Sequence, residues 1–164
     1  MTADKERLQT AQWILERNLA WIAAAEVKVG VVVAIDTAMI GGLGAAFSAS
    51  DAATRTAWAN LWTGSAALAL ACGLFCAAMA VLPRVTGPAK SLVFFGRIGP
   101  CGDVEYADRL RAATDAELLA DWSAQIHRNA QIACDKFGWV RKGMYWSFLS
   151  VAPWFGAIVT LLKK

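Results

Sequence analysis

The chain has 164 residues, of which 57% are hydrophobic and 18% charged, and its mean hydropathy is +0.42. This composition is too apolar for an ordinary soluble domain and is typical of a membrane protein. The net charge of +3 is a weak signal, because excess Lys and Arg in a membrane protein first set its orientation, so nucleic-acid binding is not indicated. The four cysteines show no CxxC spacing, which argues against a disulfide framework or a zinc site.

Residues 1–28 have the pattern of an amphipathic helix. Because no Gly or Pro separates this segment from the apolar run that begins at Val29, we predict one long helix that leaves water and enters the membrane near Lys28. The charged N-terminal sequence has no apolar h-region, so we expect no cleaved signal peptide. The apolar residues of the stripe recur at intervals of three and four: Leu8, Ala11, Leu15, Leu19 and Ile22.

The first predicted span, residues 29–47, carries Asp36 close to its middle. A carboxylate at that depth is costly, so we predict that it faces a protein interior or is protonated, and its default interpretation is functional. The alternative is a purely structural contact that holds helices together. Its expected hydrogen-bond partners in that case are Thr37, Asn60, Thr63 and Ser65, and a small-residue face for helix contact is formed by Ala38, Gly42 and Ala46 with Gly41 and Ala45 beside them.

The second predicted span, residues 58–82, contains no Lys, Arg, Asp, Glu or His. As a helix it would be roughly 37 Å long, enough to cross a hydrocarbon layer of roughly 30 Å with some tilt. The connector before it is short and polar, so we predict a transmembrane hairpin over residues 29–82, with Ser50 or Asp51 capping the second span.

Residues 83–142 are predicted to form a loop followed by helices. Prolines and glycines forbid a continuous helix at first, and SLVFF at 91–95 predicts one short extended segment rather than a sheet. Asp103 can cap a short helix over 104–113, and Thr114 with Glu117 forms a capping box for a second amphipathic helix. That helix runs into the third predicted span, 143–164, where Pro153 predicts a kink.

The basic residues predict the orientation. Four lie before residue 29, one in the connector, nine between 83 and 142 and two at the C-terminal end. The positive-inside rule therefore places the N-terminus and residues 83–142 in the cytoplasm, and the connector and C-terminus outside. The predicted fold class is an all-α membrane protein with three transmembrane helices, two of them continuous with amphipathic cytoplasmic helices that form a small helical module.

The sequence gives little support to an enzyme. His127 is the only histidine, and with Cys134 it makes a poor metal site because a third ligand is missing. No GxSxG, P-loop or HExxH motif occurs, so we predict no catalytic residues, no metal and no resident cofactor. A small oligomeric ion channel, with Asp36 on the pathway, and a membrane-tethered scaffold that recruits a partner both remain open.

Three blocks resemble the membrane effectors of bacterial Pycsar anti-phage systems, the PycTM family. They are ERNLAWIAAAEVKVGVVVAI at 16–35, SLVFFGRIG at 91–99 and QIHRNAQIACDKFGWVRKGMYWSF at 125–148. The resemblance implies that a separate cyclase makes a cyclic pyrimidine mononucleotide, cCMP or cUMP, on infection. It implies further that the effector then damages the inner membrane, so that infection is aborted. Because three spans per chain are too few for a wide pore, we expect a homo-oligomer in the lipid bilayer.

A cyclic mononucleotide requires a cation or N–H donors at its phosphate, a flat apolar surface for its base and hydrogen-bonding groups at the pyrimidine edge. We therefore predict a pocket between the two amphipathic helices and residues 91–106, with Arg97 as the phosphate contact. The alternative is that the two phenylalanines cover a helical core and that Arg97 meets lipid phosphates. The predicted ligand-binding residues are Arg97, Phe94, Phe95, Tyr106, Gln125, Asn129, Lys136 and Asn18.

Overall fold

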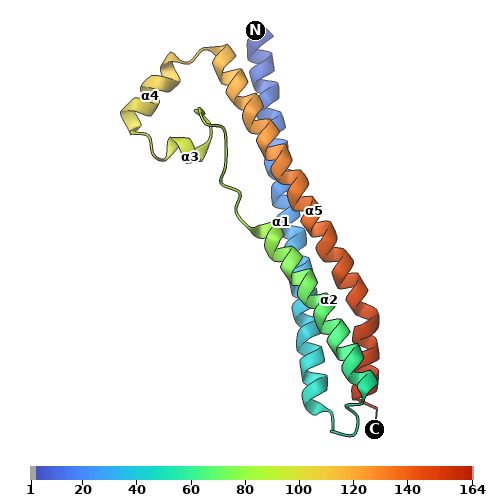
Figure 1. The fold of residues 1–164 in the computed structure, drawn as a ribbon. Helices are drawn as coiled ribbons and strands as arrows, with labels where there is room; N and C mark the ends of the chain where they lie inside the picture. Colours follow the sequence, from blue (N-terminus) through green and yellow to red (C-terminus); the bar gives the residue numbers. More distant parts are fainter. Residues whose placement is uncertain (1–2, 164) are drawn as a thin grey trace. The chain divides into compact units, whose positions relative to one another are not determined.

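The computed structural model describes residues 3–163, and its side chains are described from Lys5 onward. No strand occurs among residues 3–163, and the predictions for residues 1–2 and 164 lie outside the described residues. The helices are α1 (Ala3–Ala49), α2 (Ala57–Val81), α3 (Phe95–Ile98), α4 (Asp103–Ala112) and α5 (Asp115–Leu161) (Figure 1).

The chain divides into two compact units. Unit 1 comprises residues 1–24 and 83–135, and unit 2 comprises residues 25–82 and 136–164. The helices α1 and α5 are each 47 residues long, and the boundary between the two units falls inside each of them. The prediction that α1 continues past Lys28 and that α5 continues past Gly143 is therefore confirmed.

Unit 2 is built from α2 and the adjoining parts of α1 and α5. Three helices, α1, α2 and α5, are long and apolar enough to cross a membrane, which agrees with the prediction of three membrane-spanning helices. Pro153 lies inside α5 and does not end it. The buried apolar residues form two clusters, one of Ala25, Val29, Val32, Ala77, Ala80 and Val140 and another of Leu43, Ala46, Ala59, Ala66, Ala157 and Leu161.

The start of α2 differs from the prediction. Thr56 is the N-cap, and its hydroxyl accepts a 3.2 Å hydrogen bond from the backbone N–H of Ala59. The predicted cap Ser50 instead donates to the carbonyl of Phe47 at 2.7 Å and accepts from Nε of Arg55 at 3.0 Å. Its hydroxyl is thus occupied at the end of α1, so the prediction of Ser50 or Asp51 as the cap was wrong.

The small-residue face predicted on the first span is divided between two environments. Gly42 is half-buried, and a Cβ there would lie 3.3 Å from the ring of Trp154, while Ala46 is buried in an apolar cluster. Gly41 and Ala45 are exposed, as is Ala38. Only part of the face is therefore used within one chain.

In unit 1, α5 begins with the predicted capping box. The N–H of Thr114 donates to Oε2 of Glu117 at 2.8 Å, and the N–H of Glu117 donates to Oγ1 of Thr114 at 3.3 Å. These reciprocal bonds satisfy two backbone donors that a helix start leaves open, which confirms the prediction. The helix α4 begins one residue earlier than predicted, because Gly102 and not Asp103 is its N-cap.

Candidate functional site

Unit 1 contains a cavity of about 240 Å³ between α1, α5 and the segment that precedes α3. We call it the unit 1 cavity. Its apolar lining comes mainly from α1 and from the segment, and its polar lining comes mainly from α5. The lining residues are Leu15, Leu19, Arg84, Thr86, Val93, Phe94, Phe95, Gln125, Arg128, Asn129 and Ile132.

Two arginines supply the positive charge of the unit 1 cavity. Arg128 is firmly engaged, because its Nε donates to the carbonyl of Thr86 at 2.9 Å and a second nitrogen bonds the Thr86 hydroxyl. Arg84 is held more loosely, with a 3.5 Å bond from Nη1 to the carbonyl of Ile132 and a 4.0 Å contact from Nε to Asp135. Distances this long indicate weak bonds, so Arg84 is the more adaptable of the two cations.

Phe94 and Phe95 form the aromatic wall of the cavity. Their ring centroids lie 4.8 Å apart and the planes are inclined by 60°. A Cβ at Gly87 or at Gly96 would come within 2.6 Å of the Phe94 ring. The absence of a side chain at both glycines is therefore what allows the ring to lie where it does.

The amides of α5 lie beside this wall. Gln125 is 5% exposed, and its Nε2 donates to Oγ of Ser91 at 3.2 Å. The same Ser91 oxygen accepts the backbone N–H of Phe94 at 2.9 Å, so one hydroxyl positions both the amide and the aromatic segment. Asn129 donates to the carbonyl of Gln125 at 3.0 Å, which leaves its amide oxygen as an acceptor.

The structure brings together four of the eight predicted ligand-binding residues, Phe94, Phe95, Gln125 and Asn129, in the unit 1 cavity. The other four do not line it. Asn18 is 3% exposed and donates to the carbonyl of Ile126 at 3.0 Å, and the Tyr106 hydroxyl donates to the carbonyl of Leu92 at 2.9 Å. Arg97 is exposed on α3.

Lys136 belongs to unit 2. Its Nζ lies 2.9 Å from Oε1 of Glu26 and 2.9 Å from the carbonyl of Ala80, so it joins α1, α2 and α5. It is 4% exposed, and its charge is already paired within unit 2. The sequence reasoning missed Arg84 and Arg128 as cavity cations, and the only signal for Arg84 was its position directly after the uncharged span.

Unit 2 holds the predicted functional acid. Asp36 is fully buried, and neither carboxylate oxygen has a hydrogen-bond partner among the described residues. A Cβ at Gly73 of α2 would lie 2.4 Å from Oδ2 of Asp36 and 3.3 Å from Oγ of Ser147 of α5. The predicted hydrogen bonds of Asp36 with Thr37, Asn60, Thr63 or Ser65 were therefore wrong, and its neighbours across the helices are a glycine and a serine farther along the chain.

The comparisons with known proteins identify the family. The family described as "PycTM: Pycsar effector protein domain" matches residues 10–163. The chain belongs to this Pycsar effector family. No curated protein and no solved structure matches the chain. The membership agrees with three helices that are long and apolar enough to cross a membrane, and it supports a role in anti-phage defence. This family is not a known enzyme family.

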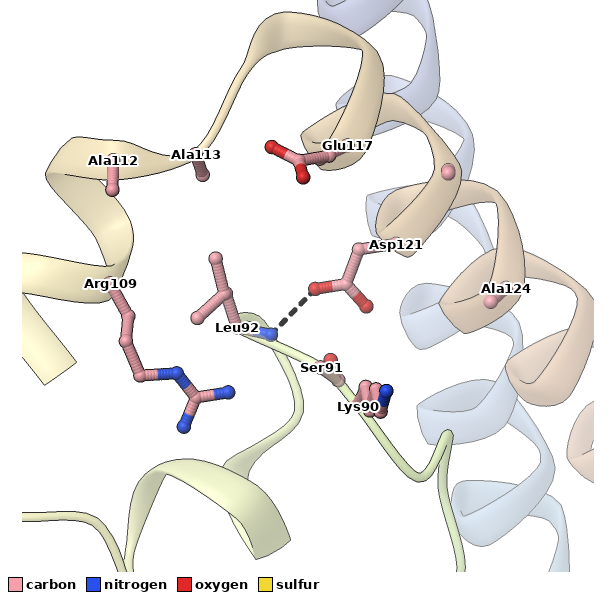
Figure 2. A pocket seen from close by; sticks show the side chains of 10 residues that line it. Lys90, Ser91, Leu92, Arg109, Ala112, Ala113, Glu117, Asp121 and Ala124 are labelled. Carbon is pink, nitrogen blue, oxygen red and sulfur yellow. Dashed lines mark hydrogen bonds between the residues drawn. The ribbon is translucent and has the colours of Figure 1, made fainter.

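This Pycsar effector has a second, larger cavity of about 600 Å³ in unit 1, between α4, α5 and residues 90–92 (Figure 2). The backbone N–H of Leu92 donates to Oδ2 of Asp121 of α5 at 2.6 Å, and Figure 2 marks this bond with a dashed line. The hydrogen bond from the backbone N–H of Thr114, and to a smaller extent the one from its hydroxyl, hold the pKa of Glu117 below its usual value. Two acids and two bases, Lys90 and Arg109, line this cavity and no aromatic ring does, so it offers no stacking surface for a nucleotide base.

Proposed function

We propose that this chain is an anti-phage membrane effector whose unit 1 cavity binds a cyclic pyrimidine mononucleotide, cCMP or cUMP, made by a separate cyclase. The observation that carries the proposal is the combination of Arg84, an aromatic wall and two amides around one cavity of about 240 Å³. These are the three kinds of group that such a ligand requires.

Each part of the ligand has a counterpart in the cavity. The phosphate carries one negative charge, and the loosely held guanidinium of Arg84 can turn toward it with two parallel N–H donors. The base can pack against Phe94, for whose ring the missing side chains at Gly87 and Gly96 leave room. The amides of Gln125 and Asn129 offer donors and acceptors for the edge of the pyrimidine.

The expected consequence of binding is damage to the bacterial inner membrane, with unit 1 on the cytoplasmic side. A ligand can shift the packing of the spans only if it binds two states of the chain with different affinity. Since α1 and α5 run from unit 1 into unit 2, they are the elements that would carry such a change. The exposed residues Ala38, Gly41 and Ala45 on α1 would allow close contact between chains in a homo-oligomer.

Isothermal titration of the purified full chain with cCMP, cUMP and cAMP tests the binding step. We expect one pyrimidine nucleotide to bind and cAMP to bind far more weakly. Replacement of Arg84 by Ala removes a charge-assisted hydrogen bond, which is worth about 1.5–3 kcal/mol, so the affinity should fall about tenfold or more. Arg97→Ala is the matched control, because that arginine is exposed and does not line the cavity.

A second pair of variants tests the aromatic wall without removing it. Gly96→Ala places a methyl group against the Phe94 ring, whereas Gly102→Ala meets open space. We expect weaker nucleotide binding for Gly96→Ala and unchanged binding for Gly102→Ala. Equal binding by all of these variants would show that the nucleotide does not bind in the unit 1 cavity. If none of the three nucleotides bound, the proposal would be overturned.

The buried carboxylate of Asp36 favours one second candidate, a small oligomeric ion channel without a nucleotide ligand. A conductance in planar bilayers that needs no nucleotide and that Asp36→Asn abolishes would support the channel. The same titration separates the two functions, because a channel of this kind, or a scaffold, would bind none of the three nucleotides.

A further inference from the structure

Asp36 occupies the most unusual position in unit 2. It is 0% exposed, and both carboxylate oxygens are without a hydrogen-bond partner among the described residues. The hydroxyl of Ser147, which also lies beside Gly73, donates to the carbonyl of Gly143 at 3.1 Å. A bare carboxylate in such a place would be several kcal/mol less stable than one in water.

No opposite charge is placed to compensate for it. The helix α2 contains no acidic or basic residue, and its titratable groups are the thiols of Cys72 and Cys76. From Gly143 to its end at Leu161 the only titratable group of α5 is the phenol of Tyr145, which is exposed, and α1 has no other charged residue between Lys28 and its end at Ala49. The bordering lysines, Lys28 and Lys142, lie over the rings of Phe137 and Trp139. The protein itself therefore provides no cation for Asp36.

A metal cation does not suit this position. Magnesium and calcium take six or more oxygen ligands. The described residues contain no group of three or more His, Cys, Asp and Glu side chains that could hold a metal. A proton needs only one carboxylate oxygen, and it removes the charge without any further ligand.

We propose that Asp36 is a proton-binding site in the membrane core and that its carboxyl group holds one proton while the three spans are packed. Gly73 makes the site possible, because any side chain there would occupy the space of the carboxyl group. The inference does not rest on nucleotide binding and stands or fails separately from it.

An apolar cavity lies close to this carboxyl group, because Ser147 lines it. Unit 2 has a cavity of about 300 Å³ between α1 and α5, and its lining includes Ile35, the neighbour of Asp36 in sequence, and Ser147. Apart from Lys28 at one end and Ser147, the lining is apolar: Val31, Val32, Ile35, Met144, Phe148 and Val151. Dicyclohexylcarbodiimide is apolar and reacts with protonated carboxyl groups. The carboxyl oxygen bonds to the central carbon while the proton moves to a nitrogen, so nothing leaves.

The test uses the full chain in lipid nanodiscs at pH 7. The protein is treated with dicyclohexylcarbodiimide, and the modified residue is located by mass spectrometry. We expect modification at Asp36 but not at Asp51, which is exposed in the connector and serves as the control acid. Asp36→Asn should remove that modification. Modification that sodium or potassium ions suppress at constant pH would overturn the proposal, because the site would then hold a metal cation.

Infrared spectroscopy of the same samples covers the case in which the reagent fails to reach the site. The difference spectrum between the wild type and Asp36→Asn at pH 7 should contain the carbonyl band of a protonated carboxylic acid. A difference spectrum with carboxylate bands alone would overturn the proposal, whatever the labelling result.

Discussion

The contact between Gly73 and Asp36 allows the effect of a mutation on stability to be estimated from the structure. A methyl group at Gly73 would lie 2.4 Å from Oδ2 of Asp36. Heavy atoms in good contact are about 3.5 Å or more apart, so one of the two groups must move by roughly 1 Å. Because Asp36 is fully buried and Ser147 lies 3.3 Å from the same methyl position, little space exists for that movement. We expect Gly73→Ala to lower the free energy of unfolding by about 1–3 kcal/mol.

The assay is unfolding of the purified chain in mixed micelles with increasing SDS, followed by tryptophan fluorescence and circular dichroism. Gly64→Ala is the matched control, because Gly64 lies on the same helix, is exposed and has no neighbour within 4 Å. We expect the control to be as stable as the wild type. A stability loss of the same size in both variants would mean that the cost arises in the helix backbone.

A double-mutant cycle tests whether the stability loss of Gly73→Ala comes from its contact with Asp36. In an Asp36→Ala background the carboxyl group is gone, so adding Gly73→Ala should cost much less than it does in the wild type. If the cost of Gly73→Ala were unchanged in that background, the contact between Gly73 and Asp36 would not be its source, and the reasoning above would be refuted.

Two further predictions concern charged groups. Lys136→Met leaves the carbonyl of Ala80 without its charged donor and should lower the free energy of unfolding by about 1.5–3 kcal/mol in the same SDS assay. Glu26→Gln should lower it less, because the Glu26 side chain is 52% exposed. A larger loss for Glu26→Gln than for Lys136→Met would contradict the pairing. The lowered pKa of Glu117 adds stability that is fully present above the ordinary Glu pKa of about 4.3 and is lost as the pH falls through the lower folded value. Thermal unfolding of the wild type and of Glu117→Gln should therefore differ at pH 7 and converge under acid, and a difference independent of pH would contradict this assignment.

The helices were predictable because their signals are local. The absence of charge in residues 58–82 and the lack of Gly or Pro before Val29 each depend on neighbouring residues alone. The capping box of Thr114 and Glu117 spans only one turn, and the structure contains it as predicted. The start of α2 was missed because the hydroxyl of Ser50 is bonded to Arg55, a contact that depends on how the connector folds.

The contacts of the candidate site were less predictable because they join residues far apart in the chain. Arg97 was selected because it follows two phenylalanines, yet the cavity cations come from positions before and after that segment, Arg84 and Arg128. The close neighbour of Asp36, Gly73, was missed for another reason. A search for hydrogen-bonding side chains passes over Gly73, whose contribution is the space that it leaves.

The central claim is that a cyclic pyrimidine nucleotide, acting on unit 1, makes the spans damage a membrane. The most direct measurement is dye release from liposomes that contain the purified chain, after addition of cCMP or cUMP. The account predicts release with one of these nucleotides, little or none with cAMP, and a shift of the Arg84→Ala variant to at least tenfold higher nucleotide concentration. Release that is equally fast without any nucleotide, or no release at saturating cCMP and cUMP, would contradict it.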